Sequence, residues 1–146
     1  MAGRRTVLPL IAIASYAVSW FVPVHRGGAR IGAGELPGWQ AFRLCLSTAS
    51  EIPTASLTRL PVALIVTANA LTNFWFLGAV FVLLRRPGVP HPVAKWGLLV
   101  SVVLNLFWFV LGSDRGDLLP GYYLWVASFA MLTVAAFNPG ADKAGR

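Results

Sequence analysis

Four long stretches without a charged residue constrain this chain more than any other feature of its sequence. They contain no Asp, Glu, Lys, Arg or His and cover residues 7–24, 61–84, 96–112 and 118–138. A helix needs roughly 20 apolar residues to cross a bilayer, and each stretch reaches or approaches that length. We therefore predict an all-α integral membrane protein, a four-helix bundle that forms a single polytopic domain over residues 1–146.

The overall composition agrees with this interpretation. Hydrophobic residues make up 57% of the chain and charged residues only 12%, whereas about a quarter of the residues in a soluble domain are charged. This composition excludes a water-soluble cytosolic enzyme and a disordered tail. The segments between the predicted spans also leave no room for a separate soluble domain.

The basic residues indicate how the spans are oriented. The chain carries 12 Lys and Arg against 5 Asp and Glu, a net charge of +7. With both termini in the cytoplasm, the basic residues of the inner segments are Arg4, Arg5, Arg85, Arg86, Lys95, Lys143 and Arg146, and those of the outer segments are Arg26, Arg30, Arg43, Arg59 and Arg115. Because Lys and Arg are enriched on the cytoplasmic side, we predict that both termini lie there. The positive charge is then explained by topology and by anionic headgroups, and no nucleic-acid partner is expected.

The first stretch also resembles a signal peptide, because Arg4 and Arg5 precede its apolar run. However, that run is longer than the usual 7–15 residues, and no small-x-small cleavage site follows Val24 at the expected place. We therefore expect the first span to be retained.

The long outer loop, residues 25–60, begins with a stretch whose glycines indicate flexibility, residues 26–34. It is predicted to carry a short amphipathic helix within 39–47. Apolar residues recur there at helical spacing and include Cys45. The candidate outer interface consists of Trp39, Phe42, Arg43 and Leu46. Three roles remain open for this helix: capping the bundle, lying in the outer membrane interface, or binding a partner.

Cys45 is the only cysteine, so an intramolecular disulfide is impossible. An intermolecular bridge remains open. We favour a packed thiol, since a free cysteine behaves largely as a small hydrophobic residue.

Amides and hydroxyls on the second and third spans form a candidate polar surface. Its residues are Asn69, Thr72, Asn73 and Asn105. The first three share one face of a helix, because they are spaced three and four residues apart, and Asn105 is their candidate partner on the next span. This surface serves either as interhelical hydrogen bonding or as a polar path or small-molecule site between helices.

The aromatic residues near the span ends suggest an interfacial belt. These are Trp20, Trp96, Trp108, Trp125, Tyr122 and Tyr123. Tryptophan and tyrosine are enriched where a bilayer meets water.

Ionisable residues are missing from all four predicted spans, which argues against proton relays, ion-coupled transport and voltage sensing. His25 and His91 fall on opposite sides of the membrane and cannot share one metal ion. The groups left on the outer side lack recognised metal-ligand spacing: His25, Glu35, Cys45, Glu51, Asp114 and Asp117. We expect no catalytic residues, no cofactor and no metal site.

Three short segments resemble uncharacterised small four-span bacterial inner-membrane proteins. They are residues 121–128, with the sequence GYYLWVAS, the Phe21-Val22-Pro23 at the end of the first span, and the outer Gly38-Trp39-Gln40-Ala41. The resemblance implies a multi-pass protein of the inner (cytoplasmic) membrane and supplies no activity.

Three functions remain as hypotheses. The first is a non-enzymatic accessory subunit that lies in the lipid bilayer and binds another membrane protein. The second is a homo-oligomeric channel or uncoupled carrier that uses Asn69, Asn73 and Asn105. The third is an outer-face enzyme or lipid-modifying factor, which requires His25, Glu35, Glu51 and Asp114 to converge.

Overall fold

The computed structural model describes residues 3–27, 34–85, 91–111 and 117–138, and these are mostly helical. In chain order the elements are α1 (Gly3–Ser19), β1 (Pro23–Gly27), β2 (Gly34–Pro37), α2 (Gly38–Ser47), the 3-10 helix η1 (Thr48–Thr54), α3 (Leu60–Arg85), α4 (Pro92–Leu111) and α5 (Pro120–Phe137). The all-α prediction is confirmed apart from one short hairpin.

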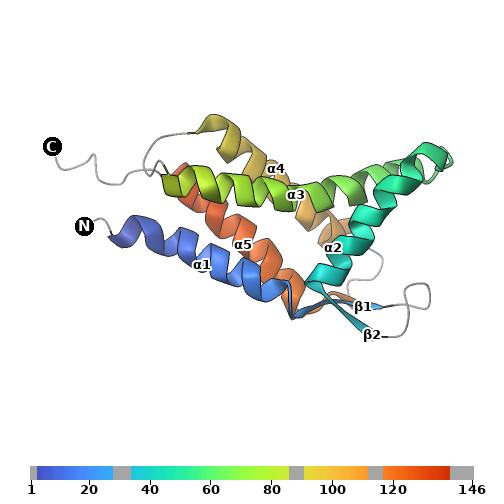
Figure 1. Cartoon of the computed structure of the whole chain (residues 1–146), viewed down its shortest axis with the longest axis horizontal. Helices are drawn as coiled ribbons and strands as arrows, with labels where there is room; N and C mark the ends of the chain where they lie inside the picture. The colour runs from blue at the N-terminus through green and yellow to red at the C-terminus, as the bar shows by residue number, and fades with distance from the viewer. Residues whose placement is uncertain (1–2, 28–33, 86–90, 112–116, 139–146) are drawn as a thin grey trace.

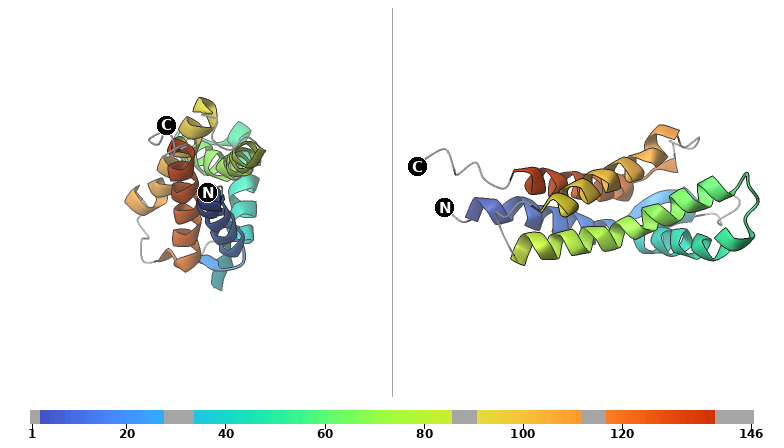
Figure 2. Two further views of the ribbon diagram at one scale, coloured as in Figure 1. Left: turned by 90° about the vertical axis from the view of Figure 1, so that its left-hand side faces the viewer. Right: turned by 90° about the horizontal axis from the view of Figure 1, so that it is seen from above.

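The four long helices pack into one elongated bundle. α5 lies along α1 and also contacts α4, and α4 in turn packs on α3. Figure 1 and Figure 2 show the start of α1 and the ends of α3 and α5 at one end of the molecule, and the hairpin and α2 at the other. Successive long helices therefore run in opposite directions.

Proline marks the beginning of three of these helices. Pro61, Pro92 and Pro120 lie in the first turn of α3, α4 and α5. Proline is tolerated there because the first amide groups of a helix have no intrahelical acceptor. These starts lie within four residues of the predicted spans 61–84, 96–112 and 118–138, although Gly112 itself falls outside the described residues.

The helix in the region of the predicted first span, 7–24, has different bounds from that span. The helix begins at Gly3 and ends at Ser19, so that Pro9 lies inside it. The chain then turns through Trp20 and Phe21, whose amides bond back to Ala17 and Val18. Pro23 ends the helical path and opens β1, because its ring has no amide donor.

The antiparallel hairpin of β1 and β2 was not expected from the sequence, which indicated a flexible stretch. His25 pairs with Leu36, Arg26 with Glu35, and Gly27 with Gly34. His25 also forms an isolated bridge with Leu118, and the amide of Leu119 donates to Val24 O at 3.0 Å. The hairpin thus fastens the end of α1 to the start of α5.

Two described helices, α3 and α5, are long and apolar enough to cross a membrane. Only 33% and 39% of their most apolar windows are buried, whereas the core helix of a soluble protein is mostly buried. The apolar parts of the other two long helices are shorter, Val7–Ser19 and Pro92–Phe107.

Aromatic rings fill the centre of the bundle. Tyr16 of α1 stacks on Phe76 of α3 with ring centroids 4.3 Å apart, and Phe76 contacts Phe129 of α5 at 4.8 Å. Phe76 and Phe129 are fully buried, as is Leu98 of α4. Residues from all four long helices therefore meet in one core.

Candidate functional site

The structure buries all four residues of the candidate polar surface. Asn69, Thr72 and Asn73 lie on the inner face of α3 and Asn105 on α4, each with at most 6% of its surface exposed. Unpaired polar groups are costly in an apolar interior, so their hydrogen-bond partners decide what this surface does.

Asn73 joins α3 to α1. Its Oδ1 accepts a hydrogen bond from the Tyr16 hydroxyl at 2.9 Å, and its Nδ2 donates to the carbonyl of Ala70 at 2.9 Å. The same Tyr16 ring stacks on Phe76, one turn further along α3. A hydrogen bond and a ring contact thus hold α1 on α3, two helices that otherwise contact each other little.

Asn105 joins α4 to α3 and α5. Its Nδ2 donates to Thr72 Oγ1 at 3.3 Å and to the Ser101 carbonyl at 2.7 Å. Its backbone carbonyl accepts a 2.6 Å bond from the Tyr122 hydroxyl of α5. Thr72 Oγ1 in turn donates to Asn69 O at 2.7 Å. Asn105 therefore lies beside the predicted asparagine face, but its direct partner there is Thr72.

The sequence did not predict that Tyr16 and Tyr122 belong to this hydrogen-bond network. Tyr16 lies in the last turn of α1, and Tyr122 was assigned to the interfacial belt, yet both are buried. The neighbouring Tyr123 is 48% exposed and fits the belt, as does Trp96 at 61%. Trp20 and Trp125 instead pack partly against the core, and the side chain of Trp108 lies outside the described residues.

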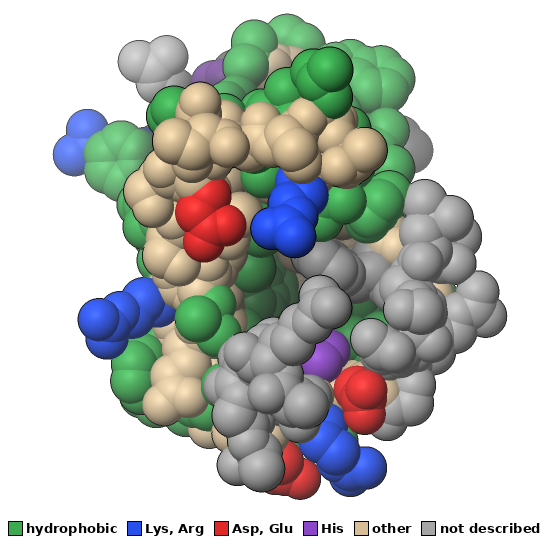
Figure 3. Space-filling model, turned by 90° about the vertical axis from the view of Figure 1, so that its right-hand side faces the viewer, with side chains coloured by type: hydrophobic (Ala, Val, Ile, Leu, Met, Phe, Trp, Pro, Cys, Tyr) green, Lys and Arg blue, Asp and Glu red, His purple; other side chains and the backbone are tan. Residues whose placement is uncertain are grey.

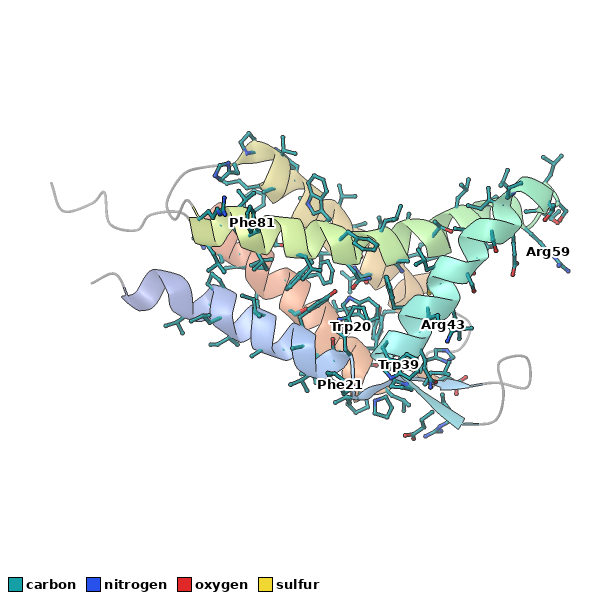
Figure 4. The ribbon with its side chains drawn as sticks, in the orientation of Figure 1. Trp20, Phe21, Trp39, Arg43, Arg59 and Phe81 are labelled. Carbon is teal, nitrogen blue, oxygen red and sulfur yellow. The ribbon has the colours of Figure 1, made fainter. Side chains whose placement is uncertain are left out.

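The predicted helix in the outer loop is confirmed as α2, but its apolar residues divide between two surfaces. The ring of Phe42 packs between Trp20 and Phe74, with centroid distances of 5.1 and 6.0 Å. Trp39 and Leu46 are exposed, and so is Arg43 between them in the sequence. Phe42 thus caps the bundle, while Trp39, Arg43 and Leu46 are exposed. Figure 4 shows Trp39 and Arg43 on α2.

Cys45 is half-buried and unpaired on α2. Burial raises the pKa of its thiol above the ordinary value. The reactive thiolate is consequently scarce at neutral pH, in agreement with a packed rather than a reactive cysteine.

No protein-family model, curated protein or solved structure matches the chain. What is proposed of its function therefore rests on its own residues.

The remaining outer-side groups do not form a metal site among the described residues, where no three His, Cys, Asp or Glu side chains gather. His25 and Glu35 lie in the hairpin, whereas Glu51 lies in η1 beyond the far end of α2. Figure 3 looks onto the right-hand side of Figure 1 and shows the acidic side chains scattered, each near basic ones, rather than gathered in one cluster. Asp114 falls outside the described residues.

Proposed function

We propose that this chain is a four-span protein of the inner (cytoplasmic) membrane and acts as a non-enzymatic accessory subunit that binds another membrane protein. The proposal is supported mainly by which side chains are exposed and which are buried. Large apolar residues are exposed along all four long helices, among them Leu10 of α1, Phe74 of α3, Val103 of α4 and Val134 of α5. The amides and hydroxyls described above are buried. A water-soluble fold has the opposite pattern, so lipid is the solvent that fits this surface.

Helix length is compatible with four spans. α4 has 20 residues and α1 has 17, which correspond to about 30 and 26 Å at 1.5 Å per residue. Their apolar parts, Pro92–Phe107 and Val7–Ser19, are shorter, whereas the hydrocarbon layer is about 30 Å thick. The turn at Trp20 and Phe21, in which Phe21 is 79% exposed, lengthens the apolar path of α1 at its outer end.

The charges at the end of the bundle opposite the hairpin support cytoplasmic termini. Arg85 closes α3 with its guanidinium 4.4 Å from the centre of the Phe81 ring. Lys95 in the first turn of α4 places its ammonium 5.4 Å from the Phe137 ring, and Trp96 contacts the same ring. Basic and aromatic side chains at the same end of a bundle are typical of a membrane interface, and Lys and Arg are enriched at the cytoplasmic interface.

The polar network supports a structural role over a transport path. The hydrogen bonds of Thr72, Asn73 and Asn105 run to side chains and backbone of the bundle itself, and these residues are almost completely buried. A path through these asparagines would need groups that are free to exchange partners with a solute. We therefore assign Asn73 and Asn105 to interhelical hydrogen bonding.

We place the partner on the outward face of α3 at Gly78, and we call the open space at this residue the notch. Phe74, Gly78 and Phe81 follow at spacings of four and three residues, and both phenylalanines are more than half exposed. A Cβ atom added at Gly78 would meet nothing within 4 Å. Small residues let membrane helices approach closely, so a side chain from another helix can enter the notch at Gly78.

Photo-crosslinking in native membranes tests this function. A photoreactive amino acid at Phe81 should yield one discrete protein adduct, whose partner is identified by mass spectrometry, and Gly78→Leu should reduce that adduct at least fivefold by filling the notch. The same amino acid at Val103, on the exposed face of α4, is the control and should yield no such adduct. An adduct between two copies of this chain at Phe81 would contradict the accessory-subunit proposal and indicate a homo-oligomer. Lipid adducts alone at both positions would refute protein binding on this face.

A further inference from the structure

The exposed face of α2 combines one cation with two apolar side chains. Trp39, Arg43 and Leu46 follow at spacings of four and three residues, which places them on one side of the helix. Each is more than a third exposed. We name these three residues the α2 patch. α2 contains no acidic residue to neutralise Arg43.

The position of the α2 patch is fixed at the outer end of α1. The amide of Trp39 donates to the carbonyl of Trp20 at 3.1 Å. A Cβ atom at Gly38 would lie 2.9 Å from Trp20 Cα and closer still to the Ser19 carbonyl oxygen, so the two backbones touch. Figure 4 shows Trp39 and Arg43 beside Trp20 and Phe21, and Phe21 is 79% exposed. Exposed aromatic rings therefore gather at the level where the apolar helix ends.

The α2 patch is also continuous with the apolar sides of the bundle. Phe42, which precedes Arg43 on α2, contacts the ring of Phe74. Phe74 is itself 57% exposed. Through Phe42, α2 thus joins the apolar surface of α3.

We propose that the α2 patch binds the headgroup of an anionic phospholipid in the outer leaflet, with Arg43 on the phosphate and with Trp39 and Leu46 at the acyl boundary. An amphipathic helix with tryptophan and leucine beside a basic residue is suited to this interface. Guanidinium matches the phosphate group in shape and charge. The inference depends on the proposed membrane placement, but not on the partner at Gly78.

Crosslinking to a photoreactive phosphatidylglycerol in proteoliposomes tests the patch, because the labelled peptides can be mapped by mass spectrometry. We expect labelling of Gly38–Ser47 and a loss of about fivefold in Arg43→Gln, the effect of one basic residue near an anionic surface. Arg26→Gln is the matched control: it removes the same charge from the exposed face of β1 and should leave labelling of α2 unchanged. A zwitterionic photoreactive lipid should label α2 more weakly.

The outcomes separate this inference from the membrane placement. Equal labelling of α2 in Arg43→Gln and the unchanged chain, or equal labelling by the two lipids, would overturn the inference. Loss of labelling on adding millimolar inorganic phosphate would also overturn it and indicate a site for the free ion. Labelling of α3 and α5 without α2 would refute lipid binding by the α2 patch and support the membrane spans. If none of the three helices is labelled, the membrane spans are refuted as well. A protein adduct on α2 in native membranes would assign the patch to a protein instead.

Discussion

Gly121→Ala is expected to destabilise the bundle by about 1–3 kcal/mol, as overpacking of a close contact does. A Cβ atom at this position would lie 2.6 Å from Pro23 O and 2.7 Å from Val22 O. Both obstacles are backbone atoms, and the hairpin pairing holds them in place, so the first turn of α5 would have to move away from β1. Thermal unfolding in a mild detergent, followed by circular dichroism, should show a lower melting temperature.

Gly78→Ala is the matched control for this prediction. It makes the same chemical change within a long helix, but nothing lies within 4 Å of the added atom. Alanine is also the better helix former by roughly 1 kcal/mol. The control should therefore unfold at the same or a higher temperature. Equal melting temperatures for the two variants would mean that α5 does not meet β1 as described.

Removing the bond between Tyr16 and Asn73 is the second change with a large expected effect. Asn73→Leu leaves the buried Tyr16 hydroxyl without its acceptor and should cost about 1–3 kcal/mol. A double-mutant cycle with Tyr16→Phe should give a coupling energy of about 0.6 kcal/mol and at most about 1.7, the range measured for hydrogen bonds between membrane helices.

Tyr123→Phe serves as the control for the tyrosine change, because Tyr123 is 48% exposed. Its effect should stay within about 0.5 kcal/mol, as for surface substitutions in general. Additive effects of Tyr16→Phe and Asn73→Leu, measured by unfolding in mixed micelles, would show that the two side chains do not hold α1 on α3.

The uncharged apolar stretches predicted the starts of α3, α4 and α5 to within four residues, because an apolar stretch is a local property of the sequence. Pro61, Pro92 and Pro120 mark helix starts without reference to any other part of the chain. The common face of Asn69, Thr72 and Asn73 also follows from helix geometry alone. The end of α1 at Ser19 was not predicted, because Trp20 and Phe21 continue the apolar run up to Pro23, where the chain enters the hairpin.

Features that depend on distant contacts were not predictable in this way. Tyr16 and Tyr123 are the same residue type in equally apolar segments, and only packing places one in the core and the other on the surface. Phe42 and Leu46 lie on the same predicted face of α2, yet only Phe42 packs between the rings of Trp20 and Phe74. The hairpin depends on pairing between segments whose glycines indicated flexibility.

The central claim is that the four long helices cross the membrane with the hairpin and α2 outside. Single cysteines in a Cys45→Ser background test it by labelling with a membrane-impermeant maleimide. The exposed positions available are Phe21 and Leu57 on the outer side, and Arg85, Val93 and Asn138 on the inner side. The account predicts that Phe21 and Leu57 react in intact cells, whereas the other three react only after the membrane is permeabilised. Reaction of all five in intact cells would contradict the spans, and the reverse pattern would contradict the orientation.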